Sequence, residues 1–349
     1  MAQRCRDRPA FTGGLLLLCA AFTGLALVAT TSSGEAATAG SGATRFVAGF
    51  SADTPARVAE ASSIGVTTDI LYNGPPPPRS PLRRALVDDH MSVVDARLSG
   101  ELFYWECHRT HTVAPPPAGQ PNDYCATDED PSVDSPAVVL KTIDGWLRQD
   151  AADPLVRGYW ILDDWPYWDG GSARGLLQEV HQEIEAATPG YPAICGFGGT
   201  VLRTRGGFDL STAKNYSNGG CDMVGWYNYA PIDVLTHPST GSKLDWSMTT
   251  LLGIEGRDLA RFGWSESNAP LLGIGQAWSG PYDEHYYQPG LTVAEMQTQA
   301  AAFCAYGASA IGWYAWDDSG YGRHTDTPDN SQVIDQGIEA GEAACGFRP

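Results

Sequence analysis

The sequence predicts an α/β fold, a single-domain (β/α)8 TIM barrel, and two observations carry that prediction. Eight short apolar runs follow one another between residues 46 and 316, and the segments between them are long enough for crossover helices. This alternation is the pattern of a parallel sheet whose strands are joined by helices. The chain has 349 residues, which is enough for a barrel that typically takes about 250 residues.

The eight apolar runs are the expected barrel strands. In chain order they are Phe46–Phe50, Thr67–Tyr72, Ser92–Leu98, Val156–Leu162, Pro192–Phe197, Met223–Tyr229, Leu271–Trp278 and Ala310–Trp316.

Helix start signals support the expected crossovers. Asp53-Thr54-Pro55 opens the first expected helix, with proline at its first position, and Ser135-Pro136 opens the helix before the fourth strand. Thr292 to Glu295 have the spacing of a capping box. The segment before the sixth strand is a weak helix candidate, because Asn218-Gly219-Gly220 interrupts it.

The N-terminal residues have the pattern of a secretory signal. Arg4, Arg6 and Arg8 form a basic start, and an apolar stretch runs from Leu15 to Val28. Ala37-Thr38-Ala39 then offers a cleavage site between small residues. We therefore expect a signal peptide over residues 1–39, a barrel domain over 40–349, and a secreted, extracellular protein without membrane attachment after cleavage.

The charge balance argues against nucleic acid as a partner. The chain carries 41 Asp and Glu against 22 Lys and Arg, a formal net charge of −19. Such a field repels phosphate backbones and anionic membranes, whereas neutral sugars are unaffected. An acidic surface that only keeps the protein soluble is the simpler explanation of the charge. The protein is expected to act as a monomer.

Six cysteines remain after the predicted signal peptide, and an even number in an exported chain suggests three disulfides. Sequence neighbours would pair as Cys107–Cys125, Cys195–Cys221 and Cys304–Cys345, although spacing leaves the connectivity open. Because the chain holds neither a CxxC pair nor an HExxH motif, we expect no metal and no cofactor.

A long loop insertion is expected after the third strand, at residues 101–134. It holds Cys107, Cys125 and the run Pro115-Pro116-Pro117. In a barrel this loop lies on the C-terminal face, where active sites are built. This loop is either part of the active site or a disulfide-linked loop without a function in the site.

Paired aspartates end the fourth and eighth strands. Asp163 and Asp164 follow the apolar run of strand four, and Asp317 and Asp318 follow that of strand eight. Strands four and eight stand opposite each other across a barrel, so the carboxylates would face each other over its mouth. Glycoside hydrolysis uses two carboxyl groups that flank the scissile bond. Alternatively, these residues cap the helices that follow.

Aromatic and amide side chains gather at the same strand ends. Aromatic faces suit the apolar faces of sugar rings, and amides bind hydroxyls without charge. The candidate substrate-binding residues are Trp165, Trp226, Tyr227, Asn228, Tyr229, Gln276, Trp278 and Trp316. The alternative is that about half of the aromatic residues pack in the core.

Other polar residues near the upper face are weaker candidates. His108, His111, Asp69, Asp95 and Glu284 form no metal-binding spacing, so each is expected to be structural. Asn215-Tyr216-Ser217 is a glycosylation sequon, a triplet that often occurs by chance.

The strand ends resemble those of a broad group of glycoside-hydrolase-like (β/α)8 barrels. Residues 158–166, 222–231 and 270–277 loosely match that group's patterns at strands four, six and seven. The resemblance implies that Asp164 stands where such enzymes place the general acid/base, usually a Glu. It also implies a nucleophile at the end of strand seven, where this chain has Gln276. Either a second carboxylate such as Asp317 replaces it, or the barrel no longer hydrolyses.

The leading hypothesis is therefore a secreted glycoside hydrolase that acts on a poly- or oligosaccharide by carboxylate acid/base catalysis. Asp164, Asp163 and Asp317 are its candidate catalytic residues. A non-catalytic carbohydrate-binding barrel is the main alternative, and Gln276 supports it. A structural cell-wall or interaction protein would explain the aromatic residues less well.

Overall fold

The computed structural model describes residues 45–113, 132–163, 173–198, 200–203, 207–229, 234–236, 243–245, 247–278, 280–281, 287–288, 290–315 and 331–347. These residues all lie within one compact unit, Ala43–Pro349. The predicted signal peptide over residues 1–39 lies outside them and stays a prediction. In the described part of the chain, no helix is both long and apolar enough to cross a membrane.

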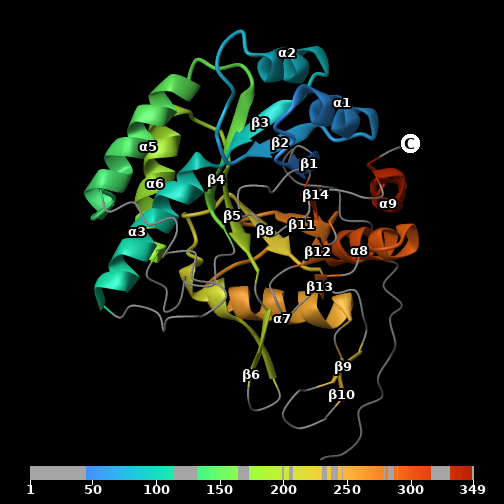
Figure 1. Ribbon diagram of the computed structural model, residues 1–349. Coiled ribbons are helices and arrows are strands. Elements are labelled where there is room, and N and C mark those ends of the chain that lie inside the picture. The colour runs from blue at the N-terminus through green and yellow to red at the C-terminus, as the bar shows by residue number, and fades with distance from the viewer. Residues whose placement is uncertain are drawn as a thin grey trace, which may run out of the picture. The chain divides into compact units, whose positions relative to one another are not determined.

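Eight parallel strands close into a barrel, which confirms the predicted fold class (Figure 1). Each predicted apolar run supplies one strand, and the last strand pairs back with the first. Around the barrel the strands follow chain order: β1 (Val47–Phe50), β2 (Thr68–Leu71), β3 (Ser92–Asp95), β4 (Val156–Leu162), β5 (Ala193–Phe197), β8 (Met223–Tyr227), β11 (Leu271–Gln276) and β14 (Ala310–Tyr314).

Helices surround the barrel strands in Figure 1. Those in the described residues are α1 (Pro55–Ser63), α2 (Pro81–Asp88), α3 (Arg97–Val113), α5 (Pro136–Asp150), α6 (Arg174–Ala187), α7 (Met248–Ala260), α8 (Val293–Tyr306) and α9 (Ser331–Ala344). α1, α5 and α8 begin where their start signals predicted, although the Ser135 side chain makes no capping hydrogen bond at the start of α5. Thr54 caps α1 by accepting a hydrogen bond from the backbone N–H of Arg57, and Thr292 and Glu295 form the capping box of α8.

The predicted insertion after strand three begins as a helix, not as a loop. α3 starts two residues after β3 and continues to Val113. Its buried residues Leu98, Leu102 and Trp105 have helical spacing, which explains why this segment packs as a helix. The prediction of a loop rested on the cysteines and prolines of this segment. Residues 114–131 lie outside the described part.

Small hairpins replace or extend several crossovers. The weak helix expected between strands five and six is a hairpin, β6 (Thr200–Arg203) with β7 (Gly207–Leu210), followed by the 3-10 turn η2 (Ser211–Asn215). Further hairpins follow β8 and β11, namely β9 (Val234–Thr236) with β10 (Lys243–Asp245), and β12 (Gly280–Pro281) with β13 (Tyr287–Gln288). All three hairpins therefore follow the C-terminal ends of neighbouring barrel strands.

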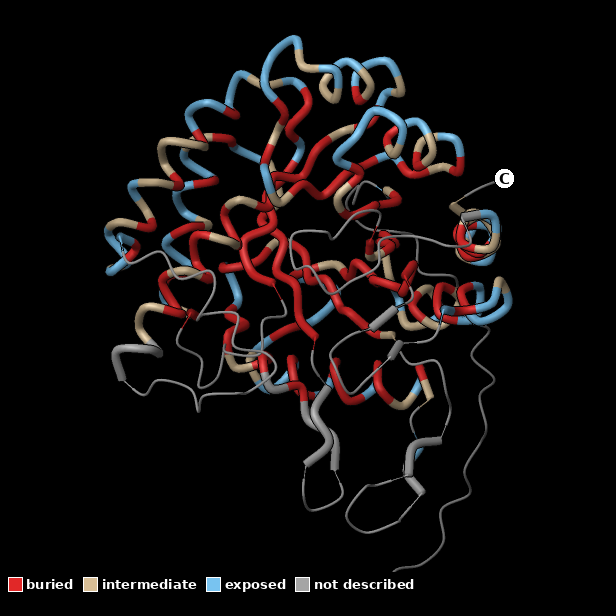
Figure 2. Tube along the Cα trace, in the orientation of Figure 1, coloured by how far each residue is buried: buried red, intermediate tan, exposed pale blue. Residues whose placement is uncertain are grey.

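Apolar side chains form two layers. One fills the barrel interior and includes Phe50, Ile70, Trp160, Tyr227 and Ile274. The other lies between the strands and the surrounding helices. Figure 2 shows the strands buried at the centre and the exposed residues on the outer sides of the helices. The inner layer forms the base on which the C-terminal strand ends stand.

Two of the predicted disulfides are confirmed, Cys195–Cys221 and Cys304–Cys345. Cys107 is also disulfide-bonded, but its predicted partner Cys125 lies outside the described residues. The sequon at Asn215 is structural. Its side chain is fully buried, and its Oδ1 atom accepts a hydrogen bond from the backbone N–H of Ala173 over 3.1 Å.

Candidate functional site

An irregularity in β4 determines where Asp163 points. Trp160 pairs with Ile194, but Leu162 pairs with the very next residue of β5, Cys195, so β4 holds one extra residue there. Trp160 and Ile194 face the barrel interior, whereas Leu162 and Cys195 face the helices. Because side chains alternate along a strand, Asp163 then faces inward. Bulges of this kind often aim side chains at functional sites.

Two tyrosines hold the Asp163 carboxylate. The Tyr72 hydroxyl donates to its Oδ2 atom over 2.7 Å, and the Tyr227 hydroxyl donates to its Oδ1 atom over 2.8 Å. Asp163 is only 4% exposed. The two hydroxyls each engage one carboxylate oxygen and so restrict the rotation of the side chain. The arrangement therefore fixes a carboxylate at the C-terminal end of the barrel interior.

Aromatic rings surround Tyr227 from several strands. Its ring centroid lies 5.8 Å from Phe50, 6.0 Å from Trp160, 5.8 Å from Tyr314 and 6.1 Å from Tyr229. All four pairs are tilted or edge-to-face, which are favourable geometries for aromatic pairs. We call these five rings, together with Trp278, the interior aromatic cluster.

Tyr229 and Tyr314 form the accessible part of the interior aromatic cluster. Their rings stack with centroids 6.3 Å apart, and both residues are partly exposed. Trp278 packs edge-on against Tyr229 at 6.1 Å and is itself only 4% exposed. A ligand entering this face would therefore meet Tyr229 and Tyr314 before Trp278.

Two amides lie at the same strand ends. The Gln276 side chain donates from Nε2 to the carbonyl of Trp278 over 2.7 Å, and it is 1% exposed. Asn228 follows β8, is 4% exposed, and its backbone N–H donates to the carbonyl of Ile274. A fixed amide thus stands at the end of the seventh barrel strand, where the resemblance implies a nucleophile.

The structure does not bring Trp226 to this group. Its ring is fully buried and lies 5.0 Å from Trp264 and 5.2 Å from Tyr306, in the layer between barrel and helices. Its neighbour Tyr227 faces the interior because adjacent strand residues point to opposite sides. The sequence does not show which of two adjacent strand residues faces the interior, so the prediction that Trp226 lies at the barrel mouth with Tyr227 is wrong.

Several candidate residues lie outside the described part of the chain, namely Asp164, Trp165, Glu284, Trp316, Asp317 and Asp318. The strands that precede the aspartates do stand opposite each other, since β4 and β14 are four places apart around the barrel. Asp163 is the candidate catalytic residue whose surroundings are described.

Tyr72 and Tyr314 are site residues that were not predicted from the sequence. Tyr72 immediately follows β2, and Tyr314 is the last residue of β14. Both residues lie at the C-terminal ends of predicted strands. An aromatic residue at such an end was the criterion that selected the other candidates, and it also applies to these two.

Two of the weaker candidates are buried among structural partners. Asp69 on β2 is fully buried, and its Oδ1 atom accepts a hydrogen bond from the backbone N–H of Ala52 over 3.1 Å. Burial raises the pKa of Asp69 to about 7. Asp95 forms an ion pair with Arg97, which also pairs with Asp150. Burial and the neighbouring Asp95 raise the pKa of Asp150 to about 8.

Solved structures with a similar fold include three β-galactosidases. The enzyme from Rahnella sp. R3 aligns with a TM-score of 0.54 and 12% identity, over 86% of this chain and 55% of that one. The enzyme from the psychrophilic Marinomonas ef1 gives 0.53 and 9%, over 86% and 59%. That from Bacillus circulans sp. alkalophilus gives 0.52 and 10%, over 85% and 55%. The chain spans little more than half the length of these enzymes.

The chain has the fold of a glycoside-hydrolase-like (β/α)8 barrel. The resemblance drawn from its strand ends is thereby confirmed at the level of the fold. No protein-family model matches the chain, and no curated protein sequence matches it either. A fold of this kind hosts many functions, so only the residues of the site bear on the function of this chain.

Proposed function

We propose that this protein is a secreted glycoside hydrolase that cleaves a poly- or oligosaccharide by carboxylate catalysis. The observation that carries the proposal is the Asp163 carboxylate, which is held by Tyr72 and Tyr227 at the C-terminal end of the barrel interior. Active sites of such barrels are built at this end. The fold, shared with β-galactosidases, is compatible with this chemistry.

The two aspartates of strand four would have different roles. Asp163, which accepts two hydrogen bonds, suits a charged role, in which it stabilises the positive charge that develops on the sugar ring. Asp164 is the proposed general acid, because the resemblance at strand four implies that it stands where such enzymes place this group. Asp317 is the proposed second carboxylate from the opposite wall of the barrel.

The interior aromatic cluster would bind the sugar. Tyr229 and Tyr314 offer partly exposed ring surface close to Tyr227, and Tyr227 itself binds Asp163. Ring stacking on these tyrosines would place a glycosidic bond near the carboxylate. No cofactor is needed for this reaction.

A non-catalytic carbohydrate-binding barrel is the second candidate. Gln276 favours it, because this side chain is an amide engaged with the carbonyl of Trp278 at the place where a nucleophile is expected. Such a barrel would keep the aromatic cluster and lose turnover.

Release of reducing sugar from a panel of neutral polysaccharides tests the proposal. We expect the wild type to release sugar, and Asp163→Asn and Asp164→Asn each to lower turnover by at least about 10²-fold, the low end for losing an acid or base. Asp144→Asn, which makes the same change on the outer helix α5, is the matched control and should be unaffected.

Binding to the same panel separates the two candidates. Saturable binding without sugar release by the wild type would establish the binding barrel in place of the hydrolase. Neither binding nor release from any polysaccharide would reject both.

A further inference from the structure

A cluster of a histidine and two carboxylates lies at the other end of the barrel. His181 and Glu185 belong to α6, and Asp222 immediately precedes β8. One potential ligand atom from each of the three side chains lies within 4.8 Å of the others. This place is at the N-terminal ends of the strands, opposite the end that holds Asp163.

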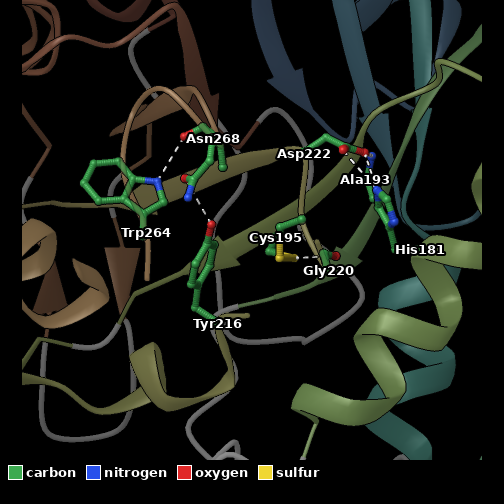
Figure 3. Close-up of a disulfide and its surroundings, with 10 residues drawn as sticks. His181, Ala193, Cys195, Tyr216, Gly220, Asp222, Trp264 and Asn268 are labelled. Atoms are coloured by element: carbon green, nitrogen blue, oxygen red, sulfur yellow. Dashed lines mark hydrogen bonds and ion pairs between the residues drawn. A yellow bond between two sulfur atoms is a disulfide. The ribbon is translucent and has the colours of Figure 1, made fainter. Parts of the chain in front are cut away.

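The surrounding structure fixes two of the three groups. His181 Nε2 lies 3.0 Å from both carboxylate oxygens of Asp222, and Asp222 Oδ2 also accepts a hydrogen bond from the backbone N–H of Ala193 over 2.9 Å. The disulfide Cys195–Cys221 anchors the residue before Asp222 to β5. Figure 3 shows the His181 and Asp222 side chains facing each other beside this disulfide.

Glu185 gives the cluster an unbalanced charge. It lies one helical turn after His181 on the same face of α6, and among the described residues it makes no hydrogen bond or ion pair. Its carboxylate and that of Asp222 are like charges, and His181 can neutralise at most one of them. A divalent cation would neutralise both and would draw the exposed Glu185 side chain inward.

We infer that His181, Glu185 and Asp222 form a zinc site that ties α6 to the start of β8. In a tetrahedral zinc site with bonds of about 2.0–2.2 Å, ligand atoms lie about 3.3 Å apart, which is close to the His181–Asp222 spacing. One imidazole and two carboxylates suit zinc, whereas calcium prefers six to eight oxygen ligands. Because Glu185 is exposed, water could supply the fourth ligand.

The zinc is structural. Residues at the N-terminal face of such barrels serve stability, and catalysis takes place at the other face. Zinc binding should therefore stabilise the folded chain by mass action without any effect on carbohydrate turnover.

Calorimetric titration of zinc into the tag-free mature protein, after dialysis against a chelator, tests the site. We expect one zinc per chain and a rise in Tm of roughly 4 °C at a hundredfold excess over Kd. Titration with calcium should give no saturable binding. Glu185→Gln should weaken zinc affinity at least about tenfold, since even the loss of a supporting residue costs about 10–100-fold.

Glu183→Gln is the matched control, because it removes the same charge from an exposed position of the same helix. It should leave zinc affinity unchanged. Glu185→Gln should fold like the wild type, since Glu185 has no partner in the described structure. Absence of saturable zinc binding, or equal affinity in the Glu185→Gln and Glu183→Gln variants, would overturn the proposal.

Discussion

The hydroxyl of Tyr72 lies 2.7 Å from Oδ2 of Asp163, although the two residues are 91 positions apart in the sequence. The contact joins the C-terminal ends of β2 and β4, which are separated by β3 in the barrel. With Tyr227 on the other carboxylate oxygen, it fixes the orientation of Asp163. The position of this carboxylate thus depends on three strands.

Removal of the Tyr72 hydroxyl should impair turnover more than folding. A hydrogen bond to a charged group contributes about 1.5–3 kcal/mol, and each 1.4 kcal/mol of lost transition-state stabilisation is tenfold in rate. Tyr72→Phe should therefore lower kcat about tenfold or more on any polysaccharide that the wild type cleaves. Tyr191→Phe, at the opposite end of the barrel before β5, is the control. Equal kcat values for both variants would show that the tyrosine contact has no catalytic role.

Substitution of Tyr229 should weaken carbohydrate binding, whereas substitution of Trp226 should lower the stability of the fold. Tyr229→Ala removes partly exposed ring surface and should weaken carbohydrate binding by about 1–3 kcal/mol, the scale for a large apolar side chain. Trp226→Phe leaves a cavity between barrel and helices and should lower the free energy of unfolding by about 1–3 kcal/mol with carbohydrate affinity unchanged. Calorimetric binding and urea denaturation measure the two effects. A loss of affinity in folded Trp226→Phe would contradict its placement.

Arg97 should be important for stability. Its guanidinium pairs with Asp95 and Asp150, which are 0% and 2% exposed, and it lies 5.0 Å from the ring centroid of Trp146. Arg97→Ala leaves a buried carboxylate without its cation, so the free energy of unfolding should fall by about 3–5 kcal/mol.

Arg148→Ala provides the comparison for Arg97→Ala. The Arg148 side chain is 71% exposed and pairs with Asp144 one helical turn away, so its loss should cost at most about 1 kcal/mol. Urea denaturation of both variants measures the loss of unfolding free energy. A similar loss in Arg97→Ala and Arg148→Ala would argue against a structural role for the buried ion pairs of Arg97.

Asp69 should make stability depend on pH. The pKa of Asp69 in the folded chain is about 7, above its ordinary value of 3.8. Between these two pH values the folded chain therefore retains a proton that the unfolded chain has already released. Its contribution to stability is therefore full at low pH and is lost as pH rises from about 4 through 7.

Asp69→Asn should remove this dependence. The amide oxygen can still accept the hydrogen bond from Ala52, and Oδ2 of Asp69 has no hydrogen-bond partner in the described structure. The variant should exceed the wild type in free energy of unfolding by roughly 2–4 kcal/mol at pH 8 and match it near pH 4. Asp88→Asn, at an exposed position, should follow the wild type at both pH values. If the free energies of unfolding of Asp69→Asn and the wild type differed by the same amount at every pH from 4 to 8, the pKa of Asp69 would not be raised.

Local signals explain why so much of the fold could be predicted. The start of α1 at Pro55 and the capping box at Thr292 depend on residues within four positions of each other. The eight strands were likewise visible as apolar runs, because both faces of a barrel strand are buried. α3 shows the limit of this reading, since cysteine and proline composition outweighed the helical spacing of its buried residues.

The sequence by itself determined which residues end the barrel strands, and hence that Asp163, Tyr227, Tyr229 and Gln276 stand at one end of the molecule. Only the tertiary structure decided that Asp163 and Tyr227 face the interior while Trp226 faces the helices. A strand's own sequence fixes the alternation of its side chains, but the phase of that alternation follows from pairing with neighbouring strands. In β4 the extra residue opposite Ile194 and Cys195 shifts this phase, and that shift places the carboxylate between two tyrosines.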